Sequence, residues 1–245
     1  MKIDILTLFP EMFENVLSSS ILGRAESKGI LEFHTHNIRD YSLNKHRNAD
    51  DYPFGGGAGM VMMAQPIFDC IEHVKGNSSA RCIMMSPRGR VLSPEIAMEL
   101  AKEEHLLILA GHYEGIDERV MELMDDEISI GDYVLTGGEL PAMVLIDCVS
   151  RFIPNVLGSA DSTEDESFSG QGLLEYPQYT RPSSFRGRDV PEVLLNGNHA
   201  EIKRWRREQS LLKTLRMRPD LLERASLDEK DKKFLESVKS TQNIS

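Results

Sequence analysis

The chain has 245 residues, 40% hydrophobic and 27% charged with a net charge of −11, which is typical of a folded protein with one large domain or two smaller ones. Its three cysteines lie far apart in apolar runs, which excludes a disulfide framework or a zinc site and predicts thiols in the cytoplasm. No apolar run approaches the roughly 18 residues of a membrane span, and Asp4 interrupts the N-terminal run, so we expect no membrane anchor and no secretory signal.

Short apolar runs alternate with helical patterns through the first 150 residues. Ser93 and Pro94 supply an N-cap and a first-turn proline for one of these helices. The alternation predicts an α/β fold, with a parallel sheet and helices on both of its faces. We expect strands at 3–9, 31–38, 81–86, 105–110 and 126–130, and helices at 65–75, 93–103 and 116–124.

Three segments of different character follow. Residues 139–153 are apolar nearly all round, which predicts a helix buried in the core or against another subunit. Residues 159–172 are small, polar and acidic, as in a flexible linker or a lid. Helical patterns at 199–225 and 227–239 then predict a small all-α domain. The expected organisation is an α/β domain at 1–158, a flexible acidic linker at 159–172 and a helical domain at 173–245.

Three glycine-bearing segments follow predicted strands, at 86–90, 110–119 and 130–139. Ligands of parallel sheets bind outside the carboxyl ends of the strands, where such turns meet. None of the three carries either standard phosphate-binding fingerprint. Glycine lets backbone groups approach a ligand closely, and a pocket of backbone groups suits a neutral heterocycle such as adenine. The simpler interpretation of each glycine taken alone is that it ends a strand or starts a helix.

The charge is distributed unevenly. Residues 181–218 hold ten Lys or Arg and four Asp or Glu, whereas the rest of the chain holds 18 basic and 35 acidic residues. A basic segment in an acidic protein indicates a polyanionic partner. Trp205 either stacks on a base or belongs to the apolar stripe of its helix. Candidate phosphate contacts are Arg181, Arg186, Arg188, Lys203, Arg204, Arg206 and Arg207.

Six segments, taken together and in order, resemble one family, the bacterial tRNA (guanine-N1)-methyltransferases. They are 52–63 (YPFGGGAGMVMM), 111–120 (GHYEGIDERV), 129–143 (SIGDYVLTGGELPAM), 150–158 (SRFIPNVLG), 176–182 (YPQYTRP) and 197–211 (GNHAEIKRWRREQSL). The resemblance implies methyl transfer from S-adenosylmethionine to N1 of the guanosine immediately 3′ of the anticodon of tRNA (position 37). It also implies a C-terminal trefoil knot in the α/β domain, and a homodimer whose active sites combine one subunit's cofactor loops with the other's linker and helical domain.

The resemblance assigns cofactor contacts to the three glycine-bearing segments. It implies that S-adenosylmethionine binds to Pro87, Gly89, Gly111, Tyr113, Gly115, Ile130, Gly131, Asp132, Tyr133, Val134, Leu135, Gly137, Gly138 and Pro141.

Methylation of guanine N1 requires a base for the N1 proton and a cation for the negative charge that develops at O6. The resemblance implies Arg151 for the second role and a linker aspartate before Ser-Phe for the first. This chain has Asp165 and Glu166 before Ser-Phe, so both stay candidates, with direct register favouring Glu166. Asp50 and Glu114 match other acidic positions of the family's active site. The resemblance also implies Mg²⁺ dependence, with Glu114 and the linker carboxylates as ligands, although no metal-ligand spacing is visible.

Two other functions fit the same residues. One is a non-catalytic RNA-binding protein of the same fold, and the other is a knotted methyltransferase that acts on a different RNA atom, such as a ribose 2′-hydroxyl. A nicotinamide-dependent dehydrogenase is disfavoured because the dinucleotide fingerprint and its ribose-binding acid are missing.

Overall fold

The computed structural model describes residues 1–158, 166–168 and 172–242. The chain divides into two compact units, Met1–Gly158 and Ser159–Ser245, and each is described by itself. Within the described ranges, no helix has the length and apolar character needed to cross a membrane.

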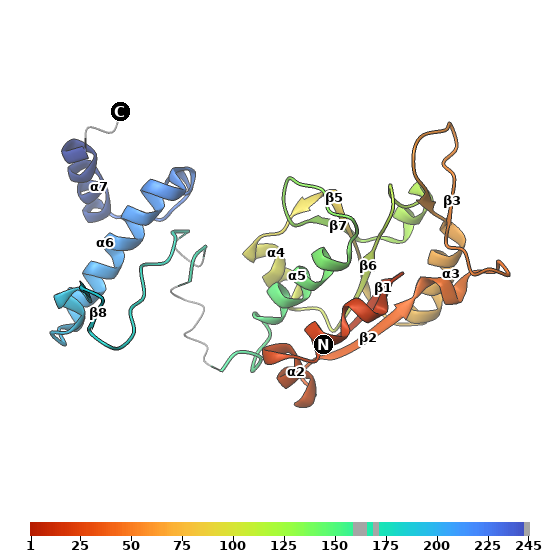
Figure 1. Ribbon diagram of the computed structural model, residues 1–245, viewed down its shortest axis with the longest axis horizontal. Helices are drawn as coiled ribbons and strands as arrows, with labels where there is room; N and C mark the ends of the chain where they lie inside the picture. Colours follow the sequence, from red (N-terminus) through yellow and green to blue (C-terminus); the bar gives the residue numbers. More distant parts are fainter. Residues whose placement is uncertain (159–165, 169–171, 243–245) are drawn as a thin grey trace. The chain divides into compact units, whose positions relative to one another are not determined.

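The first unit is built on a five-stranded, fully parallel sheet with the order β2-β1-β6-β5-β7 (Figure 1). On β1, Ile3 pairs with Phe33 of β2 on one side and with Leu106 of β6 on the other. Because every strand runs in the same direction, all the carboxyl ends lie along one edge. The strands are β1 (Lys2–Thr7), β2 (Glu32–Asn37), β5 (Arg81–Val91), β6 (His105–Ala110) and β7 (Asp126–Ser129).

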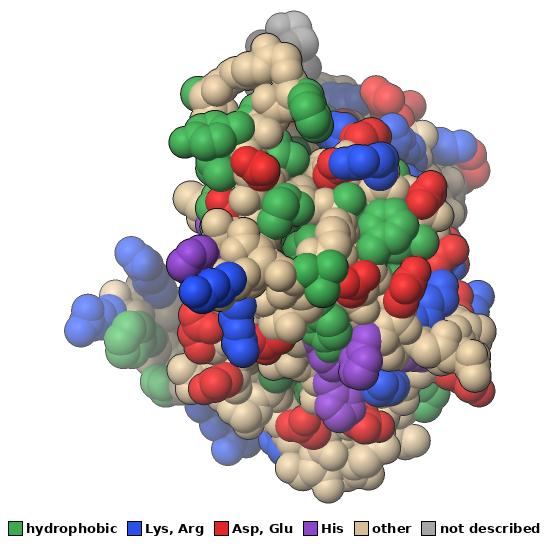
Figure 2. Space-filling view, turned by 90° about the vertical axis from the view of Figure 1, so that its right-hand side faces the viewer, with side chains coloured by type: hydrophobic (Ala, Val, Ile, Leu, Met, Phe, Trp, Pro, Cys, Tyr) green, Lys and Arg blue, Asp and Glu red, His purple; other side chains and the backbone are tan. Residues whose placement is uncertain are grey.

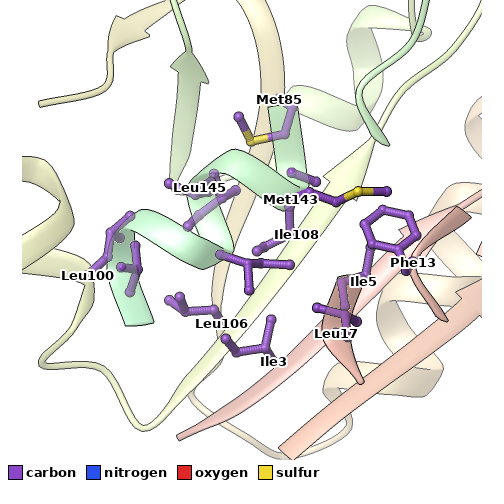
Figure 3. Close-up of a cluster of buried hydrophobic side chains, with 14 of the residues drawn as sticks. Ile3, Ile5, Phe13, Leu17, Met85, Leu100, Leu106, Ile108, Met143 and Leu145 are labelled. Carbon is purple, nitrogen blue, oxygen red and sulfur yellow. The ribbon is translucent and has the colours of Figure 1, made fainter. Parts of the chain in front are cut away.

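Buried side chains alternate between the two faces of the sheet, as expected for strands covered on both sides. Ile3, Ile5 and Ile108 belong to one core, packed with side chains of α5 (Figure 3). Leu107 and Leu109 belong to the opposite core, packed with α3. The helices of this unit are α1 (Glu14–Leu17), α2 (Ser20–Ser27), α3 (Ala64–Lys75), α4 (Pro94–Leu100) and α5 (Glu139–Ser150), with 3₁₀ turns η1 (Pro10–Met12), η2 (Ile38–Tyr41) and η3 (Glu118–Leu123).

Strand β5 departs from the expected end at residue 86. Met85 and Arg90 both pair with Ile128, so the four residues between them bulge out and the strand then continues to Val91. A Cβ at Gly89 would lie 2.3 Å from the carbonyl oxygen of Glu127, so this position accepts only glycine. The segment predicted as a turn after a strand is therefore a bulge within one.

Helix α5 has two faces of different exposure. Its buried face packs Ala142, Leu145 and Val149 into the core. Its other face leaves Leu140 and Val144 about half exposed, at 51% and 46%. The all-round apolar pattern thus reflects a core-facing side and an exposed apolar side.

The second unit contains α6 (His199–Met217), the 3₁₀ turns η5 (Glu192–Leu194) and η6 (Pro219–Glu223), and α7 (Glu229–Gln242). The predicted helix 199–225 ends at Met217, because Pro219 cannot continue an α-helix. This unit is not entirely helical, since β8 (Ser184–Phe185) and β9 (Arg188–Asp189) form a short antiparallel hairpin. Its hydrophobic core centres on Leu173, Leu211 and Leu235.

The three cysteines carry free thiols. Cys70 and Cys82 are fully buried in the core on the α3 face, and Cys148 is partly buried. Burial raises the pKa of the Cys70 thiol to about 12 and also raises the pKa values of the other two, so all three are poor nucleophiles.

A buried carboxylate joins three strands. Asp4 of β1 is fully buried, and its two oxygens lie 2.6 Å from the ring nitrogens of His36 and His105 and 2.9 Å from the Lys2 ammonium. Burial raises the pKa of Asp4, but the hydrogen bonds from its three partners outweigh this effect and hold the pKa well below its ordinary range.

Replacing Asp4 with asparagine is expected to lower the free energy of unfolding by about 2 kcal/mol at pH 7, because a charge-assisted network loses its acceptor. A depressed pKa stabilises the folded state above the unfolded value near 4, and this contribution is lost as the pH falls below it. The difference in the free energy of unfolding between Asp4→Asn and the native chain should therefore stay constant from pH 7 to about pH 4 and become smaller below pH 4. Urea unfolding measures this difference. Asp40→Asn, which removes an exposed carboxylate paired with Arg47, is the control and should change stability little. Equal stability of the native chain and Asp4→Asn at pH 7 would contradict the stabilising role of the Asp4 carboxylate.

Candidate functional site

A cavity of about 350 Å³ opens at the carboxyl ends of β5, β6 and β7. It is the place where the three glycine-bearing segments meet, as the parallel sheet requires. The β5 bulge contributes Ser86, Pro87 and Arg88, and the segment after β6 contributes residues 111–116. The segment after β7 contributes Ile130, Gly131, Tyr133, Val134, Leu135, Thr136, Gly137 and Gly138, and Pro141 of α5 closes the lining.

Two of the three segments are in direct backbone contact. The amide of Gly138 donates a 2.6 Å hydrogen bond to the carbonyl of Gly111, and His112 forms an isolated antiparallel bridge with Gly137. A Cβ at Gly138 would lie 2.8 Å from the Gly111 nitrogen and 2.9 Å from the Ala110 Cα, both backbone atoms. Position 138 therefore requires glycine, because any side chain there would keep the segments after β6 and β7 apart.

The cavity also borders a projecting hairpin, β3 (Asp50–Asp51) and β4 (Val61–Met62). Backbone hydrogen bonds tie it to the segment after β6: the Met62 amide donates to Gly115 and the Glu114 amide donates to Met60, at 2.9 and 3.0 Å. Figure 2 shows hydrophobic side chains on the projecting part of this hairpin. Between its strands Phe54 is fully exposed. The hairpin thus fixes the position of Glu114 and leaves an apolar tip uncovered.

A buried polar group lies behind the cavity. Glu139, in the first turn of α5, is 2% exposed and accepts a 2.9 Å hydrogen bond from the hydroxyl of Thr7. Its other oxygen lies 3.5 Å from Nδ1 of His112, a buried nitrogen without a hydrogen-bond partner in the described part of the chain. Sequence reasoning missed Glu139 and His112. Their only signal was position, since each is a polar residue directly beside a glycine of the motifs.

Most of the candidate cofactor residues line this cavity. The exceptions are Gly89, which packs against β7, and Asp132, which is exposed beside the lining. Among polar residues that sequence reasoning did not single out, Ser86, Arg88, His112, Glu118 and Thr136 also line it. Arg88 lies 3.3 Å from the Glu127 carboxylate and 3.4 Å from that of Glu118, so this cation is held at the rim by acidic neighbours.

Comparison with known proteins identifies the family. The family model described as tRNA (Guanine-1)-methyltransferase TrmD matches residues 1–224. Proteins named tRNA (guanine-N(1)-)-methyltransferase are 57% identical over 240 residues in Staphylococcus epidermidis, covering 98% of both chains, and 58% identical over 242 residues in Moorella thermoacetica, covering 97% and 96%. A third, from Caldanaerobacter subterraneus, is 60% identical over 235 residues, covering 96% of this chain and 97% of the relative. The chain belongs to the tRNA (guanine-N1)-methyltransferase family.

As a member of this family the chain is a methyltransferase. Glu114 lines the cavity, whereas Asp50 pairs with Met62 in the β3–β4 hairpin and is not part of the lining. Arg151 caps the carboxyl end of α5, with its amide bonded to Asp147. Glu166 is partly buried in the second unit, and Asp165 lies outside the described residues. Of these candidates, the structure places Glu114 in the wall of the cavity.

The candidate RNA contacts of this family member differ in how they are held. Lys203 and Arg204 are exposed on α6, and Arg181, Arg186 and Arg188 are exposed on and near the β8–β9 hairpin. Arg207 instead joins α6 to α7, through a 2.6 Å ion pair with Asp231. The guanidinium of Arg206 lies over the ring of Tyr176, 4.7 Å from its centroid. The five exposed residues are therefore better placed to contact phosphates than Arg206 and Arg207.

In the described ranges, no group of three His, Cys, Asp or Glu side chains is arranged to hold a metal ion. The pair His34 and His36 on β2 is engaged by carboxylates, with Glu32 at 2.7 Å and Asp4 at 2.6 Å respectively.

Proposed function

We propose that this chain transfers a methyl group from S-adenosylmethionine to N1 of the guanosine immediately 3′ of the anticodon of tRNA. The family match over residues 1–224 supports the reaction class, and the names of the relatives support the target atom. The observation that carries the proposal is the glycine-lined cavity at the carboxyl ends of β5, β6 and β7. On this proposal the enzyme acts in the cytoplasm, where tRNA is found.

The cavity fits the methyl donor in size and chemistry. About 350 Å³ lies within the range of small-molecule sites. Five lining residues are glycines, which present only backbone groups, and the remainder combine apolar side chains with few charges, as an adenosine requires. The residues that would hold S-adenosylmethionine are Pro87, Gly111, Tyr113, Gly115, Ile130, Gly131, Tyr133, Val134, Leu135, Gly137, Gly138 and Pro141. Bound there, it supplies a methyl group activated by its sulfonium charge.

The protein's own part is to orient the guanine and to take its N1 proton. Glu166, or Asp165, would accept the proton as the N1–carbon bond forms, so that the carboxylate ends protonated and the sulfonium becomes a neutral thioether. Arg151 would stabilise the charge that develops at O6. Glu114, already in the cavity wall, would lie beside the methyl donor, and Asp50 would act from the neighbouring hairpin. Orientation of the two reactants supplies much of the remaining rate.

For Mg²⁺, the described residues include no group of three His, Cys, Asp or Glu side chains that could hold the ion. No step of the proposed reaction is routed through the metal.

Two features support tRNA binding and dimerisation. The five exposed basic residues lie in the second unit, which we assign to the tRNA backbone. The exposed apolar side of α5, with Leu140 and Val144, is the surface that we assign to a second copy of the chain. A single-chain mass in sedimentation at micromolar concentration would contradict the dimer. The trefoil knot belongs to the same proposal and is supported by the family match over residues 1–224.

The test is methyl transfer from labelled S-adenosylmethionine to two tRNA transcripts. One carries guanosine immediately 3′ of the anticodon and the other carries adenosine there. We expect label in the first transcript alone, recovered as N1-methylguanosine. Label in both would show that the target is wrong, and recovery as a ribose 2′-O-methyl group would favour the other knotted methyltransferases. Tight binding of tRNA without transfer by the folded protein would favour the non-catalytic RNA-binding function.

A further inference from the structure

The second unit contains a cavity of about 500 Å³, and its lining includes Arg181, one of the five residues assigned to the tRNA backbone. It lies between the segment 176–183 and helix α6, with residues from 190–195 forming the remaining wall. Its lining combines aromatic rings, aliphatic side chains and a guanidinium, contributed by Tyr176, Tyr179, Ile202, Trp205 and Arg206.

Two aromatic rings meet at this cavity. The ring centroids of Tyr179 and Trp205 are 6.3 Å apart, with their planes inclined at 51°. Tyr179 is 49% exposed and Trp205 is partly buried. Trp205 is not part of the unit's hydrophobic core, which centres on Leu211 and its neighbours. The rings therefore present apolar surface to the cavity and not to the interior.

Arg206 adds an unused hydrogen-bond donor beside the rings. Its guanidinium is held over Tyr176, and its Nε is buried with no hydrogen-bond partner in the part of the chain that the structure describes. Buried donors are nearly always paired, because leaving one unpaired is costly.

We propose that this cavity binds a single unstacked nucleobase of an RNA strand. Aromatic rings stack on any base, and the Arg206 guanidinium, which lines the cavity, is a donor for the carbonyl oxygens and ring nitrogens of base edges. Lys203 and Arg204, exposed on the same helix, supply the positive charge for the flanking phosphates. The assignment of the strand to tRNA rests on the proposed function, whereas the base site itself rests on the residues above.

Trp205 is the single tryptophan of the chain and reports on the site directly. The full-length protein would be titrated with a short single-stranded oligoribonucleotide and with an abasic oligonucleotide of equal length and charge. We expect saturable quenching of Trp205 fluorescence by the first, about tenfold weaker binding of the second, and no quenching by it. Equal quenching and affinity for both would overturn the proposal, because phosphate contacts alone would then explain binding.

Variants separate stacking from general damage to the fold. Tyr179→Ala should raise the KM for tRNA about tenfold and leave kcat at saturation unchanged, and Tyr179→Phe should restore the KM, since stacking needs the ring and not the hydroxyl. Met217→Ala removes an exposed apolar side chain at the end of α6 that does not line the cavity and should keep the native KM. An unchanged KM in Tyr179→Ala would overturn the proposal. Base-dependent quenching without any methyl transfer would leave the base site standing and refute the proposed function instead.

Discussion

Alanine at Glu166 is expected to lower kcat by about 10²-fold or more, because removal of a general base typically costs this much. The affinity for S-adenosylmethionine should stay close to native, since the proposed cofactor contacts all lie in the first unit. The rate of the variant should rise with pH, because hydroxide then replaces the missing carboxylate in removing the N1 proton. Single-turnover methyl transfer across a pH series measures both effects.

The matched control for Glu166→Ala is Asp165→Ala, one residue earlier in the chain. We expect Asp165→Ala to keep most of its activity. The reverse result, with Asp165→Ala inactive and Glu166→Ala active, would transfer the role of base to Asp165. Full activity of both variants would refute a linker carboxylate as the base. Circular dichroism and the affinity for S-adenosylmethionine show whether any loss comes from misfolding.

Alanine at Gly138 is expected to weaken S-adenosylmethionine binding about 10- to 100-fold. The added Cβ would lie 2.8 Å from the Gly111 nitrogen, so the segments after β6 and β7 would have to separate. Overpacking of this kind costs about 1–3 kcal/mol, and each 1.4 kcal/mol is a tenfold change in Kd. Isothermal titration with S-adenosylmethionine measures the effect.

Gly158→Ala is the control for Gly138→Ala, because a Cβ at Gly158 meets no atom within 4 Å and its backbone is unstrained. It should bind S-adenosylmethionine as the native chain does. RNA binding by the basic second unit should persist in both variants. Native affinity of Gly138→Ala for S-adenosylmethionine would show that the cavity is not the cofactor site.

Local patterns were enough to predict the sheet and the edge at which the site lies. The five strands are present, and their shared direction brings the glycine-bearing segments together as expected. The β5 bulge was not predicted, because it depends on the register with β7 and not on the residues of the bulge. The contact between Thr7 and Glu139 was also missed, since it joins residues 132 positions apart and has no local signature.

The second cavity was beyond sequence reasoning for a related physical reason. Trp205 falls on the apolar stripe of its helix, and periodicity alone assigns such a residue to the core. The structure instead shows that segment 176–183 places Tyr179 against it and leaves a hollow. Whether an apolar stripe meets a core or a cavity depends on what the distant chain segment supplies.

The glycine lining of the first cavity has a consequence for drug resistance. Point mutations change side chains and leave main-chain amides and carbonyls in place, so an inhibitor bonded to main-chain groups of this lining presents few targets for escape. Replacing Gly138 itself would move the segments that hold the inhibitor, but on the proposed function it would exclude the natural methyl donor as well. Resistance would then have to arise from more distant positions or from increased expression of the enzyme.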